Sequence, residues 1–123
     1  MVPSAAGAVV LVPFPFTDLT QAKLRPAVAL ADAGRGDWIL VQVTSKPYGD
    51  PRAIQLTESS FRSGSLRIVS YVRPGKLFTA NDTLFVAQVG VLTDGALHEI
   101  ITALMTILSG SGSAEQREQG PRG

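Results

Sequence analysis

The residues in this sequence best suited to chemistry are an arginine and a threonine at the ends of two apolar segments. Arg25 precedes Pro26 in the run KLRPAVAL, and Thr44 and Ser45 close the run WILVQVTS. A proline cannot donate to a sheet ladder and holds the preceding residue in extended geometry, so Arg25 and Pro26 predict the first residues of a strand. A guanidinium fits two phosphate oxygens, and a threonine hydroxyl can hold a third. These side chains form a candidate phosphate site.

Side chains alternate along a strand, which places Arg25 on the face of Ala27 and Ala29. We expect little side-chain bulk there to hinder a flat anionic group. Other bases near this site are Lys23, Arg73 and Lys76. More ordinary roles compete with phosphate binding, because a strand-edge arginine commonly makes a surface ion pair and a strand-end threonine commonly bonds its own backbone. Spacing alone favours these ordinary roles.

Other chemistries lack the residues they need. His98 is the single histidine, which excludes a two-histidine acid/base pair, and we expect it to lie solvated on a helix. The chain has no cysteine, so it forms neither a disulfide nor a thiolate metal site. No glycine-rich phosphate loop, paired acidic metal motif or nucleophile elbow occurs. We therefore expect no cofactor and no metal ion.

The elements that must position Arg25 and Thr44 are short strands followed by one helix. Apolar runs predict strands at 9–12, 25–30, 38–44, 53–57, 66–72 and 84–92, with a long loop at 13–24 and a break at Arg73 to Gly75. Thr93 or Asp94 can cap a helix whose apolar stripe runs from Leu97 to Leu108. This order predicts a mainly β fold, a small antiparallel barrel with one C-terminal helix. We expect one domain over 1–109 and a disordered tail over 110–123.

Composition narrows the class of protein. A chain of 123 residues can bury a hydrophobic core large enough to fold without disulfides or a bound metal. Its formal net charge is +1. Basic residues predominate between Lys23 and Lys76, although a surface of mixed sign is the plainer interpretation. No basic residue precedes the N-terminal apolar stretch, and no apolar run is long enough to span a bilayer. We expect a soluble, cytoplasmic protein without membrane association.

Four segments taken together resemble the MazF/PemK-type toxins of type II toxin–antitoxin modules. In order, they are GAVVLVPFPFTDL, KLRPAVAL, WILVQVTSK and SYVRPGKLF, and the likeness covers residues 7 to 108. The resemblance implies an SH3-like or CcdB-like barrel that works as a homodimer, binds a cognate antitoxin and cleaves single-stranded RNA without a metal. It assigns catalysis to Arg25 and Thr44. It also implies substrate binding by the neighbouring polar and basic residues Lys23, Ser45, Lys46, Arg73 and Lys76.

The implied reaction is attack of an RNA 2′-hydroxyl on its own phosphate, which leaves a 2′,3′-cyclic phosphate and a 5′-hydroxyl. At two positions this chain differs from many relatives. After the first glycine, relatives have an acidic residue and this chain has Ala8; directly before the arginine of the RP motif, relatives have a second basic residue and this chain has Leu24. Two alternatives stay open. One is a CcdB-like toxin that binds DNA gyrase and cleaves nothing, and the other is an inactive relative that binds an antitoxin.

Overall fold

The chain forms a curled antiparallel sheet with one long helix against it. The structure is a computed structural model that describes residues 1–14 and 23–110. Its strands are β1 (Ala8–Phe14), β2 (Lys23–Gly34), β3 (Asp37–Thr44), β4 (Ile54–Leu56), β5 (Phe61–Gly64), β6 (Ser70–Asn81) and β7 (Ala87–Leu92). Its helices are the 3₁₀ turns η1 (Glu58–Ser60) and η2 (Asp82–Leu84) and the α-helix α1 (Asp94–Ser109).

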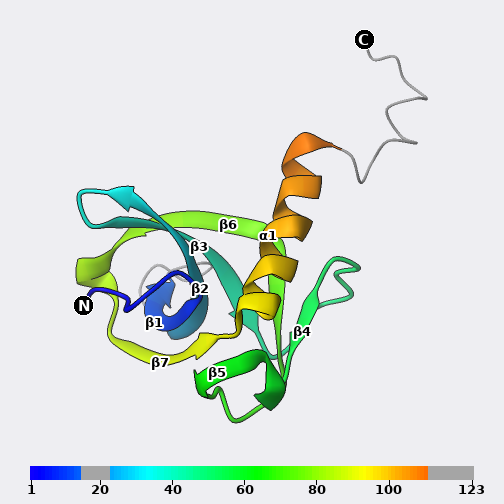
Figure 1. The fold of residues 1–123 in the computed structure, drawn as a ribbon, viewed down its shortest axis with the longest axis horizontal. Coiled ribbons are helices and arrows are strands. Elements are labelled where there is room, and N and C mark those ends of the chain that lie inside the picture. Colours follow the sequence, from blue (N-terminus) through cyan, green and yellow to red (C-terminus); the bar gives the residue numbers. More distant parts are fainter. Residues whose placement is uncertain (15–22, 111–123) are drawn as a thin grey trace.

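The sheet curls into a nearly closed barrel (Figure 1). Its strands follow the order β4-β6-β3-β2-β1-β7-β5, and every neighbouring pair is antiparallel. The two edge strands, β4 and β5, are consecutive along the chain and are separated only by η1, so the connection brings the ends of the sheet together. The predicted small antiparallel barrel with one C-terminal helix is confirmed.

The central strands β1, β2 and β3 are buried on both faces. One core cluster includes Val9, Val28 and Val41, and a second includes their chain neighbours Val10 and Ala27. This explains why these segments read as nearly continuous apolar runs, since each face of a doubly covered strand needs apolar side chains. Trp38 packs in the second cluster.

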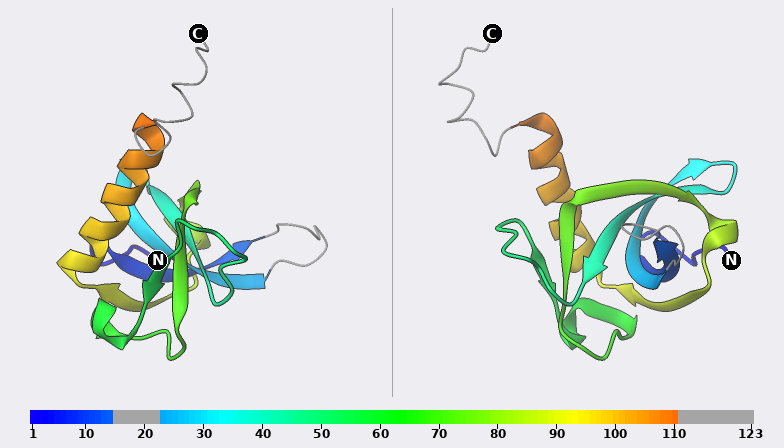
Figure 2. Two further views of the ribbon diagram at one scale, coloured as in Figure 1. Left: turned by 90° about the vertical axis from the view of Figure 1, so that its right-hand side faces the viewer. Right: turned by 180° about the vertical axis from the view of Figure 1, so that it is seen from behind.

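Helix α1 packs against the first core cluster from Ala96 to Leu104. The Thr93 hydroxyl accepts a hydrogen bond from the Ala96 N–H at 3.1 Å, which confirms the expected N-cap. Ile100 is fully buried in the first cluster, whereas Leu108, at the end of the predicted apolar stripe, is 69% exposed. The last turns extend away from the barrel (Figure 2). No helix within residues 1–14 and 23–110 is long and apolar enough to cross a membrane.

The predicted break at Arg73 to Gly75 is wrong, because β6 continues through it from Ser70 to Asn81. The β3 ladder shows how: Val41 pairs with Leu77, but the next residue, Gln42, pairs with Arg73. Three residues of β6 therefore bulge out of the ladder, and the strand resumes beyond them.

Two predicted strands also begin too early. The one predicted from residue 66 begins at Ser70, and the one predicted from residue 84 begins at Ala87 because η2 occupies the residues before it. The predicted tail, apart from Gly110, and most of the predicted loop at 13–24 lie outside the described residues.

Candidate functional site

Arg25 lies at the start of β2 and has no bonded partner in the described part of the chain. It is half-buried, and it pairs in the ladder with Val12 of β1. No hydrogen bond or ion pair joins its guanidinium to any residue of 1–14 or 23–110. The ordinary role considered for Arg25, a surface ion pair, is therefore absent among these residues. A permanently charged fork without a counter-charge is suited to an anion from outside.

The register of β2 and β3 brings Arg25 toward Thr44. Ala27 pairs with Gln42, and two residues farther along each strand come Arg25 and Thr44. Because side chains two residues apart share a face, both belong to the face of the second core cluster. The two residues to which the resemblance assigns catalysis therefore lie on the same face, each two residues beyond the last pair of the β2–β3 ladder, although they are 19 positions apart in sequence.

The face beyond Arg25 differs from the expectation. Ala27 and Ala29 are fully buried in the second cluster, where they pack with Phe14, Leu40 and Phe85. The expectation of an open alanine floor is wrong, because the curl of the sheet folds other strands over this face. At the outer end of β2, Lys23 and Leu24 are exposed and Arg25 is half-buried.

Thr44 shapes the turn that follows β3. Its side chain is buried, its hydroxyl donates to the carbonyl oxygen of Lys46 at 3.2 Å, and it accepts from the N–H of Lys46 at 3.1 Å. The backbone role expected of a strand-end threonine is thus present. One lone pair of the hydroxyl remains, and the bonds fix the backbone at Ser45 and Lys46, whose side chains are exposed.

Arg73, unlike Arg25, is held by neighbours. Its Nε donates to Asp50 Oδ2 at 3.0 Å, and its guanidinium lies 5.7 Å from the centre of the Tyr48 ring. The other oxygen, Asp50 Oδ1, accepts from the backbone N–H of Arg52 at 2.9 Å. Arg73 therefore fixes the loop that follows Thr44. Asp50 and Tyr48 were not singled out from the sequence, since their contact with Arg73 spans more than twenty residues.

The Asp50 carboxylate is stabilised in its charged form. The hydrogen bond from the Arg52 N–H, together with the bond and charge of Arg73, holds the pKa of Asp50 below its ordinary value of 3.8, and burial partly opposes this. The Asp50 carboxylate is therefore ionised at neutral pH, where it remains paired with Arg73.

The other predicted site residues are exposed lysines. Lys23 is the first residue of β2, opposite Phe14, and Lys76 lies in the bulge of β6. Neither forms an ion pair within the described ranges. His98 is exposed on α1 as expected, with Thr102 Oγ1 3.5 Å from its Nε2. Within those ranges, no group of three or more His, Cys, Asp or Glu side chains could hold a metal ion.

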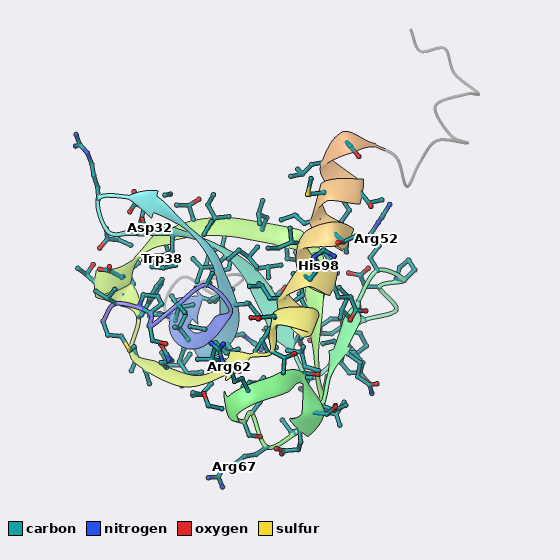
Figure 3. The ribbon with its side chains drawn as sticks, in the orientation of Figure 1. Asp32, Trp38, Arg52, Arg62, Arg67 and His98 are labelled. Carbon is teal, nitrogen blue, oxygen red and sulfur yellow. The ribbon has the colours of Figure 1, made fainter. Side chains whose placement is uncertain are left out.

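The arginines do not gather on one patch. Figure 3 shows Arg52, Arg62 and Arg67 at separate places around the barrel, which agrees with the plainer interpretation of a mixed surface. On its own strand, Arg25 has a second basic residue two positions before it, Lys23.

Comparison with known proteins identifies the architecture. The sequence matches no protein-family model and no curated protein. Among solved structures, MazF in the MazE–MazF complex of Deinococcus radiodurans superposes with a TM-score of 0.70 at 22% identity, over 89% of this chain and 98% of that one. The chain has the MazF fold.

Two mycobacterial structures share this MazF-like barrel. An endoribonuclease in complex with its cognate antitoxin, from a mycobacterial species, gives a TM-score of 0.66 at 18% identity, over 89% of this chain and 96% of that one. The Mycobacterium tuberculosis toxin MazF-mt6 gives 0.65 at 13% identity, over 83% and 96%. At these identities the likeness establishes the barrel and its helix, and residue roles depend on the geometry described above.

Proposed function

We propose that this chain is the toxin of a type II toxin–antitoxin module and a sequence-selective endoribonuclease for single-stranded mRNA. The observation that carries the proposal is Arg25: on a MazF-like barrel, its half-buried guanidinium has no counter-charge within the described residues, and it follows the end of the β2–β3 ladder on the same face as Thr44. The alternative of an ordinary strand-edge ion pair would have required an acidic partner.

The chemistry follows from the charge that Arg25 supplies. The RNA 2′-oxygen attacks the adjacent phosphorus as it loses its proton, the bond from phosphorus to the 5′-oxygen breaks, and that oxygen takes up a proton. Negative charge grows on the non-bridging oxygens, where a preorganised donor contributes roughly 3 to 4 kcal/mol. A guanidinium is a poor acid or base, so Arg25 acts by charge and not by proton transfer. Thr44 and its turn orient the phosphate, and no metal ion is needed.

The remaining site residues are assigned by their positions. The exposed side chains of Ser45 and Lys46 follow Thr44 directly, and Lys23 stands at the mouth of β2. We assign these three residues, together with Arg73 and Lys76, to binding the RNA backbone. Arg73 also holds the loop after Thr44 through Asp50.

The test is cleavage of an end-labelled single-stranded RNA in EDTA. We expect discrete cuts with cyclic-phosphate ends, and a loss of about 10²- to 10³-fold in rate for Arg25→Ala. The matched control is Arg62→Ala, which removes one exposed arginine from β5, away from Arg25. A substrate with deoxyribose at the cut position should resist cleavage, because it lacks the attacking hydroxyl.

Other outcomes would contradict the proposal in recognisable ways. Cutting that survives Arg25→Ala, or that continues at the deoxyribose position, excludes the mechanism. Intact RNA together with growth arrest and DNA damage would indicate the gyrase-binding toxin, and no arrest would indicate an inactive relative.

The proposed partners follow from the same fold. The Deinococcus structure is a MazE–MazF complex and the first mycobacterial one contains a cognate antitoxin, which supports an antitoxin as partner of this chain. We assign the antitoxin an extended acidic and apolar segment that covers the Arg25 face and excludes RNA. The proposal also includes a homodimer. It further includes a cytoplasmic location, because mRNA is translated in the cytoplasm.

A further inference from the structure

Hydrogen bonds to its backbone and to both carboxylate oxygens hold Asp50 in place. Its N–H donates to the carbonyl oxygen of Pro47 at 3.0 Å, and its own carbonyl oxygen accepts from the N–H of Ala53 at 3.1 Å. Oδ1 accepts from the N–H of Arg52 at 2.9 Å, and Oδ2 accepts from Arg73 Nε at 3.0 Å. Because every polar group of this residue is engaged, its carboxylate has a fixed position.

The turn before Asp50 brings a second group to the same arginine. Tyr48 and Gly49 have φ angles of +56° and +71°, in the left-handed region. A tyrosine is uncommon in this region and persists there where the surrounding structure determines it. The turn places the Tyr48 ring 5.7 Å from the guanidinium carbon of Arg73. Asp50 therefore holds this guanidinium at Nε while an aromatic ring lies against it.

The opposite edge of the Arg73 guanidinium is open. The contact with Asp50 uses Nε, and no residue of 1–14 or 23–110 forms a hydrogen bond with Nη1 or Nη2. These two atoms are not buried either, since Gln42 Oε1 is the one buried side-chain polar atom without a partner in those ranges. An open Nη1–Nη2 edge fits two oxygens of one phosphate.

Arg73 belongs to the face of the sheet that carries Arg25 and Thr44. Its ladder partner is Gln42, and Gln42 pairs in turn with Ala27. Paired residues point to the same side and residues two apart share a face, so Arg73 lies on that side as well. Neighbouring strands are about 5 Å apart, so β6 lies about 10 Å from β2, a distance that a few nucleotides of RNA can span.

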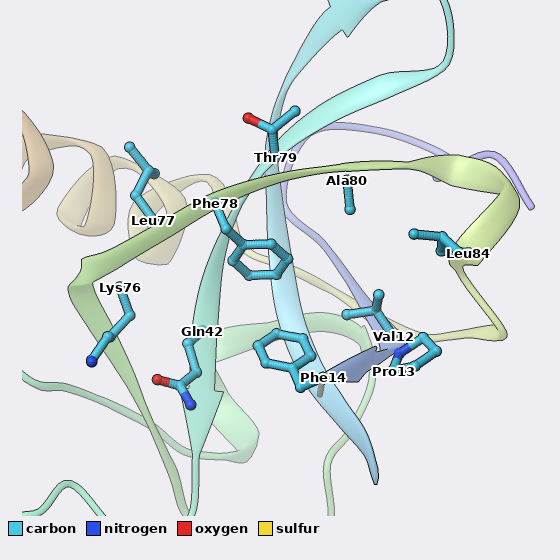
Figure 4. Close-up of a pocket in the computed structure, with 10 residues that line it drawn as sticks. All are labelled: Val12, Pro13, Phe14, Gln42, Lys76, Leu77, Phe78, Thr79, Ala80 and Leu84. Carbon is cyan, nitrogen blue, oxygen red and sulfur yellow. The ribbon is translucent and has the colours of Figure 1, made fainter. Parts of the chain in front are cut away.

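A lysine on the same side lacks such restraint. Lys76 follows Arg73 in the bulge of β6, and Figure 4 shows its side chain with that of Gln42 at one end of a pocket of about 310 Å³. It is exposed and forms no ion pair within the described ranges. An ammonium on a flexible stem has no fixed direction. Arg73 differs from Lys76 because a carboxylate sets its direction.

We infer that Asp50 is a positioning residue for RNA binding: it holds Arg73 by Nε, so that the Nη1–Nη2 edge takes a phosphate near the one on Arg25. The inference rests on the proposed function and names the residue that gives Arg73 its direction. A guanidinium that is already fixed loses less side-chain freedom on binding than a mobile one. The bond to Asp50 therefore raises affinity for RNA, although the carboxylate itself repels phosphate.

The test measures binding of the full chain to a short single-stranded 2′-O-methyl RNA of mixed sequence, which lacks the attacking hydroxyl and stays intact. Asp50→Asn can still accept from the Arg52 N–H, but its amide nitrogen cannot accept from Arg73 Nε. The matched control is Asp32→Asn, because Asp32 Oδ1 also accepts from an N–H two residues later, that of Gly34 at 2.8 Å. Asp32 forms no ion pair with a described residue and lies far from Arg52 in Figure 3.

Charge and positioning predict opposite results. Both substitutions remove one negative charge, which by itself strengthens binding of a polyanion. We expect Asp50→Asn to weaken binding about threefold to tenfold, and Asp32→Asn to leave it equal or slightly tighter. In an Arg73→Ala background, where no guanidinium is left to position, Asp50→Asn should cause no further loss. Equal or tighter binding by Asp50→Asn overturns the inference, and so does a loss that persists without Arg73.

Arg73→Lys is the second variant should Asp50→Asn fail to fold. Lysine keeps the positive charge but cannot pair with a carboxylate at one edge and a phosphate at the other. We expect Arg73→Lys to bind the probe about as weakly as Arg73→Ala. Binding as tight as that of the natural chain would overturn the inference, because charge alone would then suffice.

NMR of the Arg73 Nε–H gives a readout on the natural chain. Its signal should keep its position when the probe is added, because the bond to Asp50 is retained in the complex. A signal that moves to the position of an unpaired guanidinium would show that RNA displaces the carboxylate, which overturns the inference.

The uncleavable probe separates this inference from the proposed function. If the natural chain cleaves RNA and Asp50→Asn binds the probe as tightly as the natural chain does, the role of Asp50 is overturned and the nuclease stands. If the natural chain binds the probe through Asp50 and Arg73 but cuts no RNA, the nuclease is overturned and the positioning of Arg73 stands.

Discussion

Two arginines with the same charge have different surroundings in this molecule. Arg73 is fixed by Asp50 and lies against Tyr48, whereas Arg25 has no partner within residues 1–14 and 23–110. A guanidinium that is already paired with a carboxylate must give up that interaction to bind a phosphate through the same N–H groups. A guanidinium without a partner has no such interaction to lose. In the proposed function, the contrast favours Arg25 as the residue that meets the substrate, while Arg73 also holds the loop.

The role of the Thr44 hydroxyl can be tested with one substitution that removes it and one that keeps it. Thr44→Val removes both hydrogen bonds to Lys46 from a buried site, so we expect a loss of about 1–2 kcal/mol in unfolding free energy and of most RNA cleavage. Thr44→Ser keeps the hydroxyl and should retain both bonds and most activity. Urea unfolding and cleavage assays measure the two effects. Equal activity in the valine variant would show that the hydroxyl is not needed.

The Asp50 carboxylate predicts a pH dependence of stability. Its pKa is lowered in the folded chain, chiefly by the Arg52 N–H and then by Arg73, so the unfolded chain binds its proton first as pH falls. The stabilisation is fully present above the ordinary value of 3.8 and is lost as pH falls below it. In urea unfolding, the difference in stability between the natural chain and Asp50→Asn should be constant from pH 7 to about pH 5 and shrink toward pH 3. A difference that grows on acidification would contradict this.

At the scale of elements, the pairing of β5 with β7 depends on two facing glycines. Gly64 pairs with Gly90, and a Cβ on Gly90 would lie 2.7 Å from Ser63 O and 2.8 Å from the Phe61 ring. Such distances are shorter than real Cβ contacts, so a larger residue must push the strands apart.

Gly90→Ala should therefore destabilise the chain by about 1–3 kcal/mol. The matched control is Gly95→Ala in the first turn of α1, where an added Cβ meets nothing within 4 Å. There alanine should stabilise the helix by up to about 1 kcal/mol. Thermal unfolding of both variants tests the pair, and a neutral Gly90→Ala would show that β5 shifts freely.

The sequence pattern predicted the strands and the helix that form because of residues close together in the chain. The strand around Val41 and the helix after Thr93 follow from apolar spacing and a capping hydroxyl. The continuation of β6 past Pro74 does not, because turn formers usually end a strand and here pairing with β3 carries the chain onward. Strand β5 was not predicted at all, since Arg62 to Gly64 has little strand preference and is held by its pairing with β7.

The site divides in the same way. Arg25 and Thr44 could be selected from the sequence, because residue type, a neighbouring proline and a strand end are visible there. The burial of Gln42 with an unpaired Oε1 could not, because no local pattern in the sequence marks this amide as buried. The restraint of Arg73 likewise depends on a loop residue distant in sequence.

At the scale of the whole molecule, the second half of α1 leaves apolar surface uncovered. Met105 is 63% and Leu108 69% exposed, whereas Ile100, near the middle of the helix, is fully buried. Large exposed apolar side chains grouped on one helix are typical of interaction surfaces.

We expect a homodimer in solution. Light scattering at micromolar concentration should give twice the 13.0 kDa mass of one chain. Dilution should dissociate the dimer without unfolding it, because each barrel has its own two cores. A monomer at all concentrations would contradict the dimer and would place the whole nuclease site on a single chain.

Strand β1 lies between β2, which follows it closely, and β7, which is the last strand of the chain. During synthesis on the ribosome, the β2 edge can be filled early, but the other edge of β1 stays open until residues 87–92 have emerged. Such long-range pairing is slow, and an open edge invites association with other chains. A message truncated before it encodes these residues would therefore yield a chain that cannot close its barrel.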